Sequence, residues 1–229
     1  MPQANRLIGS LSNADIAAFK PHLKPVRLEH KRVLYDMGGT VDVVYFPTTS
    51  VVSLVVSLST GETVEAAMVG KDGVVGASAA LDGRISLSAA IVQLAGDAFE
   101  CKVEALAAAA FNSRRLLSIL VRHEQTVYAQ AQQSAACMAA HDVQARLCRW
   151  LLRARDLAGT DTLPFTQEYL AEMLGVRRTS VSPVAHALQA AGMIRYSRGR
   201  IDILNLEALQ DTTCECYAAV KSNYNRLLE

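Results

Sequence analysis

The sequence predicts an α+β fold, in which a roll of short β-strands is followed by one long helix and a C-terminal winged helix-turn-helix. Three observations lead to this prediction. Short β-branched segments alternate with turn residues between positions 26 and 103. A helical pattern then runs from about 112 to 140, and two short amphipathic segments separated by Gly175 come after it.

The composition is that of a folded protein from a reducing compartment. The chain has 229 residues, of which 51% are hydrophobic and 20% charged, and this excludes a disordered chain. The five cysteines are an odd number without regular spacing, and no signal-peptide pattern is present. The apolar runs are too short to span a bilayer. We therefore expect a soluble, cytoplasmic protein with no membrane partner.

The N-terminal part is expected to contain one helix and several strands. Residues 6–19 form the helix, which Pro21 and Pro25 end. The expected strands are 33–35, 41–46, 51–58, 64–69 and 88–94. Glycines at both ends of segment 70–76 predict a loop that another part of the chain approaches closely.

The long helix carries a narrow stripe with steps of three and four residues. The stripe consists of Leu117, Leu120, Glu124, Val127, Ala131, Ser134 and Met138. A stripe of this kind on a long helix favours pairing with a symmetry mate over packing within its own domain, so we expect a homodimer. His141 and Asp142 then form a hinge, and a further helix spans 143–158, ended by Gly159.

Segment 166–188, TQEYLAEMLGVRRTSVSPVAHAL, predicts two short helices joined by a tight turn at Gly175. An ordinary pair of packed helices would show the same hydrophobic pattern. The second helix, however, keeps a compact and mostly polar outer face, made of Arg178, Thr179, Ser182, Pro183 and His186. Strand-like segments 194–196 and 201–203 around a glycine turn predict a wing. Residues 206–229 are expected to form one last helix, buried through Leu209, Tyr217, Val220 and Leu227.

With these elements in this order, the chain resembles the Crp/Fnr superfamily of bacterial transcription regulators. The most specific segments are TQEYLAEMLGVRRTSV and ALQAAGMIRYSRGRIDIL, whereas VYFPTTSVVSLV and GKDGVVG resemble a cyclic-nucleotide-binding-type roll. The resemblance implies a sensor-type roll in 1–111, a dimerisation helix in 112–141 and a DNA-binding domain with a helical tail in 142–229. It also implies a homodimeric regulator that binds a palindromic site in double-stranded DNA, with RNA polymerase as a candidate protein partner and an unknown small-molecule effector. No catalytic residue, metal or cofactor is expected.

The resemblance also assigns contacts with DNA. Arg178 takes the position that usually reads guanine in the major groove, and Thr179 takes the next reading position. Pro183 stands where the catabolite activator protein has an arginine, so a different base preference is expected. The other expected contacts are the phosphate-binding hydroxyls of Thr166 and Ser180, the backbone-binding Arg177, Arg198 and Arg200, and Ser182 and His186 on the same face.

The effector site departs from the family pattern. Members that bind cyclic AMP have a glycine-glutamate pair and a later arginine-serine pair, but here these positions are Gly76-Ala77 and Leu87-Ser88. The helix positions expected to meet an adenine are Ala131 and Gln132. A buried phosphate without a cationic partner binds poorly, so we expect the effector not to be cyclic AMP.

Two alternatives stay open. The chain could be a small-molecule or redox sensor in which the winged helix is secondary or vestigial. Cys214 and Cys216 could form a redox switch, although as a metal site they are a weak signal because no histidine is near them in the sequence. Cys137 and Cys148 are expected to be small core residues.

Overall fold

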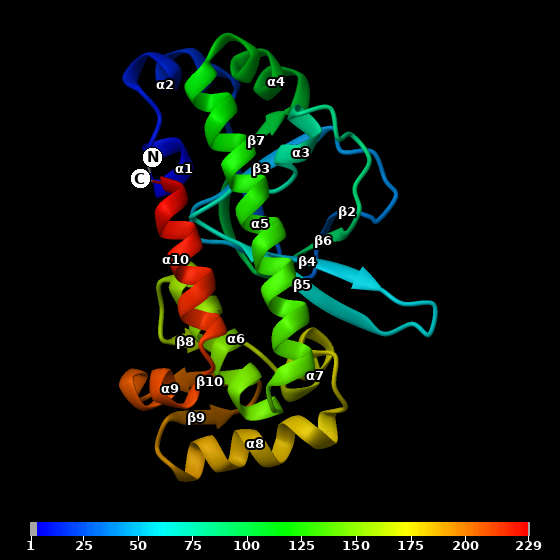
Figure 1. Ribbon diagram of the computed structural model, residues 1–229, viewed down its shortest axis with the longest axis vertical. Coiled ribbons are helices and arrows are strands. Elements are labelled where there is room, and N and C mark those ends of the chain that lie inside the picture. Colours follow the sequence, from blue (N-terminus) through cyan, green and yellow to red (C-terminus); the bar gives the residue numbers. More distant parts are fainter. Residues whose placement is uncertain (1–3, 229) are drawn as a thin grey trace.

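The computed structural model describes residues 4–228, without the side chains of 227 and 228. The β-roll occupies one part of the molecule, the long helix α5 (Arg114–Ala140) runs beside it, and the winged helix-turn-helix lies at the far end (Figure 1). The predicted α+β architecture is therefore confirmed.

Two short helices replace the single N-terminal helix that the sequence predicts. They are α1 (Arg6–Gly9) and α2 (Asn13–Phe19), followed by the 3-10 turn η2 (Lys20–His22). The Asn5 side chain accepts from the N–H groups of Leu7 and Ile8, and Ser12 accepts from Asp15. Because each of these side chains caps a helix start, the segment forms two helices rather than one.

The roll consists of two antiparallel sheets with strand orders β1-β7-β3 and β2-β6-β4-β5. The strands are β1 (Lys24–Leu28), β2 (Val33–Tyr35), β3 (Val43–Pro47), β4 (Val51–Ser57), β5 (Thr63–Val69), β6 (Ala89–Leu94) and β7 (Gly96–Lys102). The five predicted strands are confirmed, while β1 and β7 are not among the predictions. Pro25 and flanking basic residues hide β1, which is an edge strand where the missing N–H of proline is tolerated.

The glycine-rich loop after β5 is closely approached, as predicted, by the long helix. The backbone N–H of Val74 donates to Nε2 of His123 at 3.2 Å, and any side chain at Gly73 would collide with the His123 ring. Helices α3 (Ala77–Ala80) and α4 (Val103–Asn112) follow this loop and β7 respectively. Gly73 is therefore a position where the fold needs the absence of a side chain.

The stripe predicted on α5 is partly wrong. Leu120 and Ser134 are buried within their own chain, on a face that consists of Leu116, Ile119, Leu120, His123, Thr126, Gln130, Ser134 and Cys137. The neighbouring face repeats with the same steps and stays accessible, through Leu117, Val121, Glu124, Tyr128, Ala131, Ala135 and Met138. Because the helix has 3.6 residues per turn, two such stripes lie side by side, and the spacing alone does not tell them apart.

The predicted break at His141 and the helix after it are found in the structure, whereas movement about this break stays a prediction. His141 is extended (φ −114°, ψ 149°), Asp142 accepts from the N–H of Ala145, and α6 (Val143–Ala158) ends at the left-handed Gly159. The largest hydrophobic core joins the roll to this C-terminal part, because Val51, Val55 and Met68 pack in one cluster with α6 and the helices that follow it.

The tail forms two helices instead of the single one predicted, α9 (Leu206–Thr212) and α10 (Cys216–Leu228). Thr213 is extended, so the chain turns after α9, and α10 runs back along α5 toward the roll (Figure 1). Leu209, Tyr217 and Val220 are buried as predicted, whereas the side chain of Leu227 lies outside the described residues. Among residues 4–228, no helix has the length and apolar character that a membrane crossing needs.

Candidate nucleic-acid interface

A helix-turn-helix is present at the predicted place. Helix α7 (Gln167–Leu174) begins at Thr166, whose Oγ1 accepts from the N–H of Tyr169 at 3.1 Å, and it ends at Gly175. Gly175 has φ 60°, a left-handed conformation that glycine adopts without strain. Helix α8 (Arg178–Ala190) begins shortly after it and buries Val181, Ala185 and Leu188. The turn thus brings two helices together with their apolar sides facing the core.

The outer face of α8 carries most of the predicted contact residues. Figure 1 shows this helix at the end of the molecule farthest from the roll. The exposed predicted residues on or next to it are Arg177, Arg178, Thr179, Ser180, Pro183 and His186. Pro183 lies inside the helix, which continues past it although its ring removes one hydrogen-bond donor. The outer face of α8 is therefore accessible to a macromolecular partner.

Ser182 and Arg178 each contact α7. The hydroxyl of Ser182 donates to Oε1 of Gln167 at 2.7 Å, so it ties the two helices together. Arg178 lies 3.9 Å from the carboxylate of Glu168, and both side chains are largely exposed. An exposed ion pair of this length contributes at most about 1 kcal/mol, so the guanidinium can exchange Glu168 for a base edge or a phosphate.

The wing stands beside the helix-turn-helix. Its sheet has the order β8-β10-β9, formed by β8 (Thr162–Leu163), β9 (Ile194–Ser197) and β10 (Arg200–Ile203). Arg198 and Gly199 at the tip have φ 49° and 77°, the positive values that a tight hairpin turn requires. A Cβ at Gly199 would lie 3.3 Å from Cγ2 of Thr166, so the wing tip packs against the start of α7. Arg198 and Thr166, far apart in the sequence, therefore border one surface.

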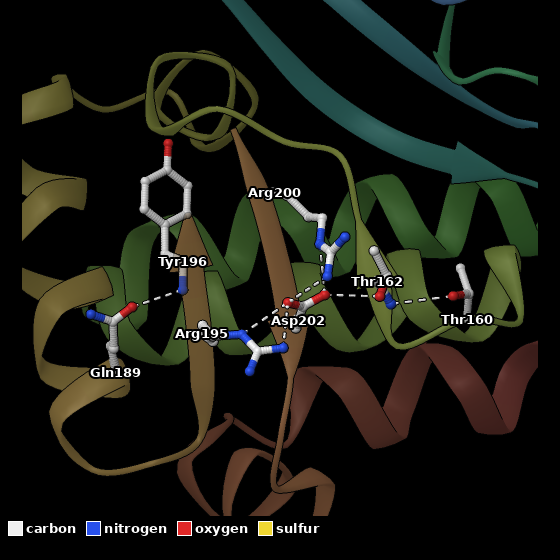
Figure 2. Close-up of polar contacts among 7 residues, drawn as sticks. All are labelled: Thr160, Thr162, Gln189, Arg195, Tyr196, Arg200 and Asp202. Carbon is white, nitrogen blue, oxygen red and sulfur yellow. Dashed lines mark hydrogen bonds and ion pairs between the residues drawn. The ribbon is translucent and has the colours of Figure 1, made fainter. Parts of the chain in front are cut away.

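Asp202 organises the wing and is not among the predicted site residues. Its carboxylate accepts from Arg200 at 3.0 and 3.1 Å, from Arg195 at 3.0 and 3.2 Å and from Thr162 at 2.8 Å (Figure 2). These hydrogen bonds, that from Arg200 first and that from Thr162 next, lower the pKa of Asp202 to about 2. Arg200 is thus held on the sheet of the wing instead of extending freely toward a phosphate.

Strand register explains this network. Arg195 lies directly opposite Asp202 in the antiparallel pair, and Arg200 lies two residues away on the same face of β10. The alternation in Arg200-Ile201-Asp202 therefore indicates that Arg200 and Asp202 lie on the same face of the strand, close enough to form an ion pair. Two further connections were also missed: the N–H of Tyr196 donates to Oε1 of Gln189 at 2.8 Å (Figure 2), and its hydroxyl accepts from the N–H of Gln167 at 3.3 Å.

The predicted effector residues are only partly brought together. A cavity of about 520 Å³ between the roll and α5 is lined by Gly76, Leu87 and Ser88, with Glu124 and Val127 from the helix. Ala77 is fully buried in the roll instead, and Ala131 and Gln132 lie farther along α5, outside the lining.

Arg84 is the cation of this cavity lining. Its guanidinium donates to Asp42 at 2.7 Å and to Glu104 at 2.9 Å, and these hydrogen bonds raise its pKa. Two carboxylates therefore share its positive charge. Among the lining residues that the structure describes, none is a cation without a carboxylate partner.

Comparison with known proteins agrees with this architecture. Residues 145–212 match the family model of the Crp-like helix-turn-helix domain. A putative Crp/Fnr-family transcriptional regulator from Eubacterium rectale is similar in structure, with 17% identity, a TM-score of 0.66 and coverage of 90% of this chain and 96% of that one. FixK2 from Bradyrhizobium japonicum has 16% identity, a TM-score of 0.68 and coverage of 84% and 98%. A Crp/Fnr-family regulator from Thermus thermophilus has 23% identity, a TM-score of 0.67 and coverage of 82% and 97%. No curated protein sequence matches the chain.

Proposed function

Because residues 145–212 form a Crp-like helix-turn-helix domain within the fold of the Crp/Fnr regulators, we propose that the chain is a homodimeric transcription regulator that binds a palindromic site in double-stranded DNA. The observation that carries the proposal is the shared surface of α8 and the wing. Arg178 lies exposed at the start of α8, while Arg198 stands at a wing tip that packs against the start of α7. Arg178 would read a guanine edge, and Arg198 would bind the phosphate backbone.

Dimerisation is supported by the accessible stripe on α5. Val121 and Tyr128 are 42% and 66% exposed, although both are large and apolar or aromatic. They share the face with Leu117 and with the small residues Ala131 and Ala135, which permit two helices to approach closely. Pairing two chains here would give the two-fold symmetry that a palindromic site requires, whose half-sites lie about 34 Å apart.

Regulation would start at the cavity beside α5. A ligand in that cavity would contact Glu124 and Val127 of the long helix. The same helix leads to the break at His141, so a shift of α5 would change how the DNA-binding domain is held. With Arg84 already paired to two carboxylates, an anionic phosphate would meet no free cation among the described lining residues. We therefore propose an effector other than cyclic AMP, and titration calorimetry that detects micromolar cyclic AMP binding would overturn this point.

The alternative function, a sensor with a vestigial winged helix, is less well supported. A vestigial domain would be expected to lose the features that position its DNA contacts. Here the Thr166 cap, the left-handed Gly175 and the ordered wing are all present.

Selection of bound DNA from a random pool tests the proposal. The wild-type chain should enrich a palindromic motif. Arg178→Ala should lose the base preference at one position in each half-site, and it should bind about 1–3 kcal/mol per half-site more weakly. Arg27→Ala is the matched control, because Arg27 is an exposed arginine on the roll and should leave selection unchanged. If the wild type enriches no palindromic motif, the proposed function is wrong.

A further inference from the structure

Four metal-ligand side chains meet at the end of the long helix. They are Cys137 near the end of α5, His141 directly after it, and Cys214 and Cys216 at the connection between α9 and α10. One ligand atom from each lies within 4.8 Å of the other three. The fold supplies the histidine and the third thiol that the Cys214-Glu215-Cys216 segment lacks by itself.

The distances suit one small tetrahedral ion. Sγ of Cys137 lies 3.6 Å from Sγ of Cys214, and Sγ of Cys216 lies 3.6 Å from Nδ1 of His141. Tetrahedral zinc with bonds of about 2.3 Å to sulfur and about 2.0 Å to nitrogen holds its ligand atoms about 3.5–3.8 Å apart. The three cysteines are buried, and His141 is mostly so. Two of the ligand–ligand distances thus already match those around a tetrahedral ion, and the remaining ones are no longer than 4.8 Å, so small side-chain shifts would bring all four atoms around one ion.

The surrounding contacts orient the ligands. Nε2 of His141 lies 3.3 Å from the carboxylate of Glu215, which favours a proton on Nε2 and leaves the lone pair of Nδ1 directed at the thiols. Nε2 of Gln133 lies 3.0 Å from Sγ of Cys216 and donates to it. Ordinary core packing would explain buried cysteines, but it would not require a histidine held by a carboxylate with its other nitrogen toward them.

We propose that Cys137, His141, Cys214 and Cys216 bind one zinc ion. On binding, the three thiols release their protons to solvent, and Zn²⁺ is held by three thiolates and a neutral imidazole. The soft sulfur donors exclude magnesium and calcium as the preferred ions. Four protein ligands close the coordination shell, so the ion has a structural role. It joins the end of α5 and the hinge to the segment that enters α10.

Metal analysis and cobalt substitution test the site. The wild-type chain, purified without chelator, should contain one zinc ion per chain. Titrating Co²⁺ into the metal-free wild type should produce the strong visible and near-ultraviolet bands of a tetrahedral cobalt-thiolate centre, and Zn²⁺ should displace them. Cys216→Ser and His141→Ala should lower the zinc content. Cys101→Ser, which changes a buried cysteine of the roll, should keep one ion per chain.

A second variant tests the orientation of the histidine. Glu215→Gln should still bind one ion but about 10–100-fold more weakly, because its amide is a poorer partner for the imidazole N–H. The proposal is overturned if the reduced wild type takes up neither Zn²⁺ nor Co²⁺ stoichiometrically. It is equally overturned if Cys216→Ser and Cys101→Ser have the same metal content, or if a Cys137–Cys214 disulfide forms and metal uptake does not follow its reduction. All of these readouts are independent of whether the protein binds DNA.

Discussion

Breaking the buried ion pair between the roll and α6 should strongly destabilise the protein. Nη1 of Arg153 lies 2.8 Å from Oδ2 of Asp72, and the two side chains are only 7% and 5% exposed. The guanidinium also stacks 4.2 Å from the ring centre of Tyr224 on α10. Arg153→Met keeps most of the aliphatic stem but leaves the Asp72 carboxylate buried without its cation.

The burial of the pair sets the expected magnitude. Exposed ion pairs contribute about 0.2–1 kcal/mol, whereas removing one partner of a buried pair costs about 3–5 kcal/mol. Typical stabilities are about 5–15 kcal/mol, so Arg153→Met should remove a large fraction of the free energy of unfolding. Replacing both residues, as in Asp72→Asn with Arg153→Met, should recover much of the loss, because no unpaired charge remains buried.

Urea unfolding measures these differences. Trp150 is the single tryptophan, is buried on α6 one turn before Arg153, and reports unfolding by fluorescence. Arg27→Met is the matched control, because the Arg27 side chain is 64% exposed in its ion pair with Asp97 and should cost no more than about 1 kcal/mol. The reasoning is refuted if Arg153→Met lowers the free energy of unfolding no more than this control does. It is also refuted if the loss in the double variant equals the sum of the losses in Asp72→Asn and Arg153→Met.

Three further predictions concern the dimer face and the wing. Val121→Glu should convert the proposed dimer to a monomer in size-exclusion chromatography with light scattering, while Val56→Glu, at a similarly exposed valine on the roll, should not; a dimeric Val121→Glu variant would exclude this face. Because the folded state lowers the pKa of Asp202 to about 2, its stabilising contribution is complete above the unfolded pKa of about 4 and is lost as the pH falls from about 4 to 2, so acid titration followed by circular dichroism should show a smaller pH dependence in Asp202→Asn. Arg198→Ala should weaken binding to all DNA sequences alike in fluorescence anisotropy, and it should reduce the slope of log affinity against log salt concentration by about one per chain. A change in sequence preference would contradict a phosphate contact.

Local chemistry explains which parts of the fold the sequence predicts well. The helix start after Asp142, the helix end at Gly159 and the turn at Gly175 depend on residues a few positions away, and all three are found where predicted. The strand prediction failed where local signals were mixed. In β1, Pro25 argues against a strand, because proline is tolerated only in strands at a sheet edge. The prediction of a single tail helix failed because the helical pattern of the sequence continues across Thr213, where the backbone turns.

The candidate DNA-binding surface could be named from the sequence because its residues lie on one short helix and a hairpin. Their contacts could not be named, since Ser182 meets Gln167 and Gly199 meets Thr166 only after α7, α8 and the wing have packed. The register that places Arg195 opposite Asp202 likewise depends on how the two strands pair.

The sequence by itself therefore determines local features such as the helix start after Asp142, the helix end at Gly159 and the turn at Gly175, because backbone sterics, caps and periodicity act over a few residues. Tertiary structure alone decides which of two adjacent stripes on α5 is buried, that Asp72 pairs with Arg153, and that Cys137 meets Cys214. These choices depend on how surfaces that are far apart in the sequence pack against each other, and local sequence patterns do not contain that information.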